Sequence, residues 1–259
     1  MRPSTTSLIQ PTRLKGQMRI SIAQTRPIKG DIRRNIERHM EFVSAAVANR
    51  ADVIIFPELS LTGYEPALAE SLATEANDNR FDVFQDASDK NAITIGVGVP
   101  TQSNSGSCIS LLLCHPLRPK RLYSKMFLHP DELPFFVAGK RVEGLVSENK
   151  GVALAICYEL SIPEHAATAF NDGAHTYIAS VAKSAGGVDK ATQRLAEIAH
   201  DYSMTVFMAN SVGPADGFQC AGKSSVWNRK GELLVQMDDE SEGIIIHDTV
   251  SQEIIVVKS

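Results

Sequence analysis

The chain lacks the features that mark several classes of protein. It has no excess of basic residues, because its 259 residues carry a formal net charge of −4 with a pI near 6.0. That balance argues against a nucleic-acid partner. No apolar run approaches the length of a membrane span, so we expect no association with a membrane. No segment is of low complexity and no shift in composition marks a linker, while the 43% hydrophobic content supplies a sizeable core.

Cysteine is also scarce. The four cysteines are Cys108, Cys114, Cys157 and Cys220, and they show neither Cys-x-x-Cys spacing nor the density of a disulfide scaffold. The seven histidines are scattered, and no two lie at metal-ligand spacing beside a cysteine. We therefore expect a reduced, cytoplasmic, enzyme-like protein with no metal site.

The first residues differ from the rest of the chain. Residues 1–17 contain Arg2, Arg13 and Lys15 and no acid, but they lack the apolar centre of a secretion signal. An organelle transit peptide is one alternative for this segment. The simpler interpretation is a mobile tail at residues 1–17 followed by one domain at residues 18–259, because Met18 directly precedes the first predicted strand.

The residue periodicity predicts a mainly α/β fold. A strand–helix–strand order occurs twice, at residues 19–58 and 152–181, and it indicates a sheet with helices packed outside. Two such halves can stack sheet to sheet with helices on both outer faces. The pattern predicts strands at 19–24, 52–56, 93–99, 108–114, 121–123, 152–156, 175–181, 205–210, 224–228, 232–236, 243–247 and 254–258, and helices at 31–47, 67–77, 81–89, 163–171 and 188–202. A glycine turn at Gly186-Gly187 is expected before the last helix.

Three of the predicted strands end in a residue with reactive chemistry. These residues are Glu58, Lys125 and Cys157. Open α/β sheets build their sites at the carboxyl ends of strands, so we expect the three to converge at one sheet edge. A desolvated Glu58 would have a raised pKa and would take the thiol proton of Cys157, while Lys125 would stabilise negative charge on sulfur or oxygen. Taken singly, each residue also fits a structural or solvent-exposed role.

Three motifs around these residues resemble the signatures of the nitrilase superfamily of carbon–nitrogen hydrolases. They read FPELSLTGYEP, YSKMFLHPDELPFF and AICYELSIPE, and they occur in the order and at the separations usual in that family. MANSVG and GKSSVW resemble its later landmarks, so that the similarity extends from Met18 to about Asp248. The resemblance implies a four-layer αββα sandwich with mixed sheets and a Glu–Lys–Cys triad.

The resemblance also implies a role for individual residues. Glu58 matches the general base of the family, Lys125 its catalytic lysine and Cys157 its nucleophile. Glu132 resembles an additional glutamate that many members place beside the lysine, although a solvated loop acid is the alternative. The backbone N–H of Tyr158 would join Lys125 in the oxyanion hole. No metal ion or organic cofactor is implied.

The expected reaction is hydrolysis of a small amide to a carboxylate and ammonia or an amine, through a thioester intermediate. The same triad also hydrolyses nitriles or transfers acyl groups, and a catalytically idle scaffold is a further alternative. The family commonly forms homodimers, which we carry over as an expectation. The sequence departs from the family after Ser180-Val181, where AKSAGG replaces a proline-rich segment that contacts substrate in many members. The substrate therefore cannot be named from the sequence. Glu159 is expected to orient the turn rather than to react.

Overall fold

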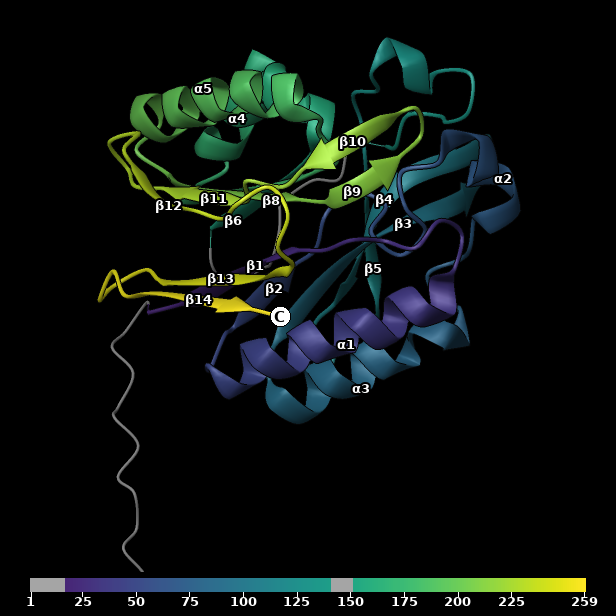
Figure 1. Cartoon of the computed structure of the whole chain (residues 1–259), viewed down its shortest axis with the longest axis horizontal. Coiled ribbons are helices and arrows are strands. Elements are labelled where there is room, and N and C mark those ends of the chain that lie inside the picture. The colour runs from purple at the N-terminus through teal and green to yellow at the C-terminus, as the bar shows by residue number, and fades with distance from the viewer. Residues whose placement is uncertain (1–16, 141–150) are drawn as a thin grey trace, which may run out of the picture.

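The computed structural model describes residues 17–140 and 151–259. The chain within these ranges forms four layers, with helices α4 and α5 on one outside, helices α1 and α3 on the other, and two sheets between them (Figure 1). The predicted αββα sandwich is confirmed. The predicted tail, apart from Gln17, lies outside the described residues, and the single-domain assignment stays a prediction.

The larger sheet of the described chain has seven strands in the order β14-β13-β1-β2-β3-β4-β5. Its strands are β1 (Arg19–Gln24), β2 (Val53–Ile55), β3 (Thr94–Ser103), β4 (Gly106–Cys114), β5 (Arg121–Ser124), β13 (Gly243–Asp248) and β14 (Ile254–Lys258). Strands β1, β2 and β3 are parallel, and β4 and β5 each run antiparallel to the preceding strand. Strands β2 and β5 therefore point the same way, and their carboxyl ends lie at the same edge of the sheet.

The second sheet in these residues has five strands in the order β12-β11-β8-β7-β6. Its strands are β6 (Val152–Ile156), β7 (Thr176–Val181), β8 (Thr205–Asn210), β11 (Ser225–Trp227) and β12 (Leu233–Gln236). Strands β6, β7 and β8 are parallel. A separate ribbon, β9 (Val212–Ala215) paired with β10 (Phe218–Ala221), was not predicted because its strands are four residues each and β9 contains Gly213 and Pro214.

The helices that cover the sheets are α1 (Ile32–Ala48) and α3 (Asp82–Asn91) on one side and α4 (Pro163–Asn171) and α5 (Ala185–Asp201) on the other, with a short α2 (Ala69–Leu72) at one end (Figure 1). Helix α1 begins as predicted, because the Asp31 side chain accepts a hydrogen bond from the backbone N–H of Arg34. None of the helices in the described residues is long and apolar enough to cross a membrane.

Two helix predictions are wrong in part. The predicted turn at Gly186-Gly187 lies inside α5, which begins at Ala185, and the Val188 N–H donates to the Ser184 carbonyl over 2.8 Å. The two glycines are tolerated because packing of α5 on its sheet, through residues such as Val188 and Ala191, outweighs their low helix propensity. The helix predicted at residues 67–77 is reduced to one 3-10 turn (Pro66–Leu68) and α2, after which residue 74 joins an isolated bridge.

The side chains of each strand alternate between two cores. Val53 and Ile55 of β2 face the core between the sheets, whereas Ile54 faces the core beneath α1 and α3. In β6, Leu154 and Ile156 face the inter-sheet core. Both faces of both sheets are thus covered, which explains why the strands read as continuous apolar runs. Burial of each such aliphatic side chain contributes about 1.5–3 kcal/mol.

Candidate active site

Glu58 and Lys125 come from the same edge of the seven-stranded sheet. Glu58 follows Phe56-Pro57 just beyond β2, and Lys125 directly follows β5. The loop that carries Glu58 lies against β3 at Gly98, where an added Cβ would be 2.3 Å from the Pro57 carbonyl oxygen. Only a residue without a side chain allows the loop to approach so closely.

Cys157 comes from the other sheet. It directly follows β6 and has a φ of +44°, a left-handed conformation that is unusual for a residue with a side chain. It keeps part of its surface exposed, whereas the other three cysteines, Cys108, Cys114 and Cys220, are buried. The expectation that one sheet supplies all three residues is therefore wrong, since the sulfur belongs to the second sheet.

A buried ion cluster brings the three acidic and basic side chains together. The Lys125 Nζ atom donates to Glu58 Oε1 over 2.8 Å and to Glu132 Oε1 over 2.6 Å. The side chains of Lys125 and Glu58 have no exposed surface, and that of Glu132 has 2%. Removing one member of such a buried cluster leaves an uncompensated charge, which is strongly destabilising. Glu132 is thus part of the cluster rather than a solvated loop acid.

Glu132 is itself held in place from two sides. Its Oε2 accepts a hydrogen bond from the His129 backbone N–H over 2.8 Å, and its Oε1 accepts one from the Tyr64 hydroxyl over 3.1 Å. Tyr64 lies in the turn after Glu58, and no local sequence pattern singles it out. Burial raises the pKa of Tyr64, and the nearby carboxylates raise it further, so this phenol stays a donor.

The electrostatics of the site keep the resting thiol protonated. Burial raises the pKa of Cys157, and the negative charge of Glu58 raises it further, although Lys183 and Lys125 act in the opposite direction. Burial also raises the pKa of Glu58. Burial lowers the pKa of Lys125, but the surrounding negative charges outweigh this effect, so its pKa is raised and it remains an ammonium ion. The thiol therefore needs a base to become a nucleophile.

Glu58 is placed to be that base. Its Oε1 atom is bound by Lys125, while its buried Oε2 atom accepts no hydrogen bond from a nitrogen or oxygen donor of the described residues. The negative charge of Glu58 acts on the Cys157 thiol, and Oε2 is the oxygen of this carboxyl that is left to accept a proton.

A second buried carboxylate, Glu159, ties the two sheets together behind the site. Its oxygens accept hydrogen bonds from the backbone N–H of Met126 over 2.6 Å, from the backbone N–H of Ile156 over 2.8 Å and from the Tyr123 hydroxyl over 2.6 Å. Met126 follows Lys125, and Ile156 precedes Cys157. Glu159 therefore fixes the lysine and the cysteine relative to each other, in keeping with the predicted orienting role.

A direct cross-sheet bond lies close by. The Ser180 hydroxyl, at the end of β7, donates to the carbonyl oxygen of Phe56 over 2.8 Å, and both residues are buried. Tyr158 follows Cys157 in a short 3-10 turn, and its ring lies edge-on to His129 with the ring centroids 5.2 Å apart. Its predicted oxyanion role stays a prediction.

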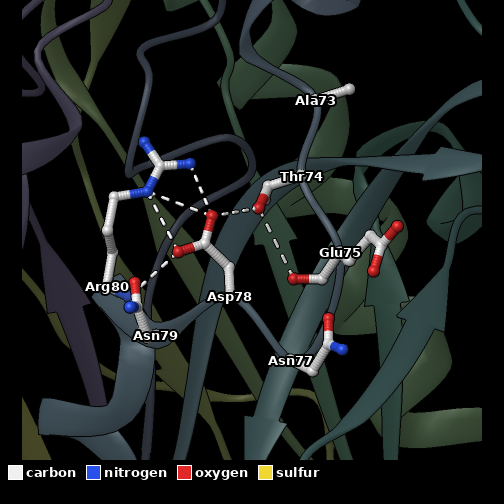
Figure 2. Close-up of a pocket in the computed structure, with 7 residues that line it drawn as sticks. All are labelled: Ala73, Thr74, Glu75, Asn77, Asp78, Asn79 and Arg80. Carbon is white, nitrogen blue, oxygen red and sulfur yellow. Dashed lines mark hydrogen bonds and ion pairs between the residues drawn. The ribbon is translucent and has the colours of Figure 1, made fainter.

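Other candidate sites in the described residues are weaker. No cluster of three or more His, Cys, Asp or Glu side chains within 17–140 and 151–259 is arranged to hold a metal ion. A surface hollow lined by residues 73–75 and 77–80 contains none of the predicted catalytic residues (Figure 2). Asp78 accepts a hydrogen bond from the Thr74 hydroxyl over 2.6 Å and pairs with Arg80 over 2.6 Å, so these two charges compensate each other within the hollow.

Two characterised relatives share sequence with the chain. It is 25% identical over 229 residues to a glutamine-dependent NAD(+) synthetase of Thermotoga maritima, with 84% of this chain covered. The chain spans only 39% of that synthetase. It is also 25% identical over 225 residues to an (R)-stereoselective amidase of Pseudomonas sp., covering 85% of this chain and 80% of the amidase.

The fold is shared with solved structures of an amidase from Nesterenkonia sp. AN1. A cysteine-to-alanine mutant in complex with butyramide superposes with a TM-score of 0.81 at 22% identity, covering 92% of this chain and 94% of that one. A second mutant, in which the acetamide moiety of fluoroacetamide is attached to the active-site cysteine, gives a TM-score of 0.80 at 22% identity, covering 89% and 90%. A cysteine-to-serine mutant of the same Nesterenkonia enzyme, an amidase from the nitrilase superfamily, also shares the fold.

The match to the family itself extends over nearly the whole chain. The sequence profile described as Carbon-nitrogen hydrolase matches residues 19–258, which include both sheets and the buried cluster between them. The resemblance inferred from the three motifs is thereby confirmed: the chain belongs to the carbon–nitrogen hydrolase family.

Proposed function

We propose that the chain is a cysteine-dependent amidase that cleaves a small amide to a carboxylate and ammonia or an amine. The observation that carries the proposal is the buried cluster of Glu58, Lys125 and Glu132 beside the partly exposed thiol of Cys157. A protonated thiol, a desolvated base and a fixed ammonium ion are the groups that acyl transfer through sulfur requires. The stereoselective amidase and the Nesterenkonia amidase that resemble this chain support the assignment.

In the acylation step, Sγ of Cys157 attacks the amide carbon while the thiol proton passes to Oε2 of Glu58. The carbonyl oxygen becomes an oxyanion. Lys125 has three N–H donors, of which two bind Glu58 and Glu132, so the third is left for this oxygen. The Tyr158 backbone N–H is the second donor in this proposal. The C–N bond then breaks as Glu58 returns its proton to the leaving nitrogen, and a thioester remains on the sulfur.

In the deacylation step, Glu58 takes a proton from a water molecule whose oxygen attacks the thioester carbon. The C–S bond breaks, the carboxylic acid leaves, and the proton on Glu58 returns to the sulfur. Glu58 thus acts as base and acid in turn, which requires a pKa above that of a solvated glutamate. Nitrile hydrolysis or acyl transfer by the same groups differs in the first electrophile or in the final acceptor, and product analysis with and without an added amine separates these reactions.

The test uses Cys157→Ala and Cys157→Ser with Cys114→Ala as the matched control. Ammonia release from butyramide should be lost in the Cys157 variants and retained in the control, because Cys114 is buried at the end of β4 in the core beneath α1 and α3. Intact mass during turnover should show an acyl adduct on the wild-type chain only. Full activity of Cys157→Ala would end the proposal.

Chemical labelling distinguishes the enzyme from an idle scaffold. Cys157 should react with iodoacetamide much faster than the three buried cysteines, and burial raises the pKa of both Cys114 and Cys220 to about 12. Equal and slow labelling of all four cysteines would favour the scaffold.

A further inference from the structure

Lys183 lies at the sheet edge that carries the sulfur. Strands β6 and β7 are parallel neighbours, and Ile156 at the end of β6 is paired with Ser180 in β7. Cys157 is the first residue beyond β6, and Lys183 is the second residue beyond β7. The two residues therefore leave adjacent strands at the same edge, on the side from which a substrate must approach the thiol.

The main chain of Lys183 is firmly held. Its N–H donates to Oδ1 of Asn210 over 2.9 Å, and its carbonyl accepts from Nδ2 of Asn210 over 3.2 Å and from the Ala221 N–H over 2.9 Å. Asn210 is itself fully buried at the end of β8. The stem of the lysine lies against the first turn of α5, where a Cβ added at Gly187 would be 3.3 Å from Cβ of Lys183.

Lys183 is half-buried, and its side chain forms no ion pair with a carboxylate of the described residues. Lys125 differs, because two glutamates compensate its charge. Lys183, like Lys125, lowers the pKa of the Cys157 thiol against the effects of burial and Glu58. A molecule bound at the sulfur therefore meets an uncompensated positive charge on this side.

We infer that Lys183 binds a carboxylate at the far end of the acyl group, so that the substrates are ω-amides of dicarboxylic acids. The inference rests on the proposed amidase function and names the substrate class of the same site. A lysine ammonium has three donors for a carboxylate, and a fixed main chain reduces the entropy lost when it binds. Lys183 occupies the AKSAGG segment, in which the sequence differs from the proline-rich pattern of many relatives.

The test compares two amides of the same shape and different charge. Succinamate ends in a carboxylate, and isocaproamide carries an isopropyl group in its place. The wild-type enzyme should prefer succinamate in kcat/KM. Lys183→Met should reduce the ratio of kcat/KM for succinamate to that for isocaproamide by about 10- to 100-fold, as expected for loss of a hydrogen bond to a charged group. The reduction should lie mainly in KM for succinamate.

Two further variants act as controls. Lys183→Arg keeps the positive charge and should retain most of the preference for succinamate. Lys190→Met removes an exposed lysine on α5 and should leave the ratio within about twofold of wild type. The hydrogen bonds of Lys183 are made by its main chain, so Lys183→Met should unfold at the wild-type urea concentration.

The outcomes separate this inference from the proposed function. A wild-type preference for isocaproamide, or an unchanged ratio in Lys183→Met, overturns the inference. Equal losses with both amides also overturn it, because they show that Lys183 acts on the thiol and not on a substrate carboxylate. Failure of the wild-type enzyme to release ammonia from succinamate, isocaproamide and butyramide alike would instead refute the amidase proposal.

Discussion

Replacement of Glu159 by glutamine tests whether one buried carboxylate sets the relative position of the lysine and the sulfur. In the wild-type chain, Glu159 Oε1 accepts from the Met126 N–H, and Oε2 accepts from the Ile156 N–H and the Tyr123 hydroxyl. A glutamine side chain offers one oxygen and one NH₂ group. In the more favourable orientation of this side chain, the oxygen accepts the hydrogen bonds from the Ile156 N–H and the Tyr123 hydroxyl. The NH₂ group then faces the N–H of Met126.

The cost follows from these contacts. The variant loses one hydrogen bond to a charged acceptor and leaves the partly buried Met126 N–H facing another donor, for a total of about 2–4 kcal/mol in the free energy of unfolding. Because Met126 adjoins Lys125, a small shift of this segment displaces the ammonium group. Misplacement by about 1 Å costs on the order of 100-fold in rate, so we expect kcat to fall about 10- to 100-fold while KM changes little.

The assay combines urea unfolding with initial rates of ammonia release from butyramide at temperatures where the variant is folded. Glu164→Gln is the matched control, because Glu164 is an exposed residue on α4 close in sequence. It should change stability by less than about 0.5 kcal/mol and leave kcat unchanged. A Glu159→Gln enzyme with the wild-type kcat and the wild-type unfolding midpoint would refute the positioning argument.

Three further predictions concern the base, its loop and the edge of the sandwich. Glu58 must be ionised to accept the thiol proton, and burial raises its pKa above the ordinary 4.5. The value of kcat/KM for butyramide should therefore fall with decreasing pH through a midpoint above 4.5. A midpoint at or below 4.5 would contradict this role. Gly98→Ala places a methyl group against the Pro57 carbonyl, so it should lower the free energy of unfolding by about 1–3 kcal/mol and reduce kcat. Gly186→Ala is the control, because the space around Gly186 is open, and it should change neither the free energy of unfolding nor kcat. Burial opposes ionisation of Asp248, but hydrogen bonds from Gln17 and neighbouring backbone N–H groups outweigh it and lower its pKa to about 2. The stabilisation from Asp248 is therefore present above the unfolded pKa and lost as the pH falls from roughly 4 to 2, so the urea midpoint of Asp248→Asn should depend less on pH in that range than the wild-type midpoint; parallel curves would contradict the assignment.

The sequence predicts the strands and the reactive residues at their ends well, for a physical reason. Strands β2 and β6 are buried on both faces and therefore read as short apolar runs, so Glu58 and Cys157 stand out as the first polar residues beyond them, whereas Lys125 directly follows the partly exposed β5. Helix α4 is predicted with the observed ends, Pro163 and Asn171, because proline at the first helical position is a strong local signal.

Other features depend on contacts that local patterns do not record. The assignment of Cys157 to a different sheet from Glu58 follows from strand pairing over long separations, which periodicity cannot reveal. Glu159 and Tyr64 bind groups 33 and 68 residues away along the chain, so their roles appear only once the sheets are stacked. The start of α5 was missed because the local propensity of two glycines is overridden by the packing of the helix on its sheet.

The division of the reactive groups between two sheets has a consequence for how the protein loses activity. The Cys157 thiol and the Glu58 carboxyl come together only while the two sheets keep their relative position. The hydrogen bonds of Ser180 to Phe56 and of Glu159 to Met126 stabilise that position. Heating or denaturant that disrupts these hydrogen bonds should abolish turnover before the helices unfold. Loss of turnover should therefore report separation of the two sheets earlier than loss of helix content does.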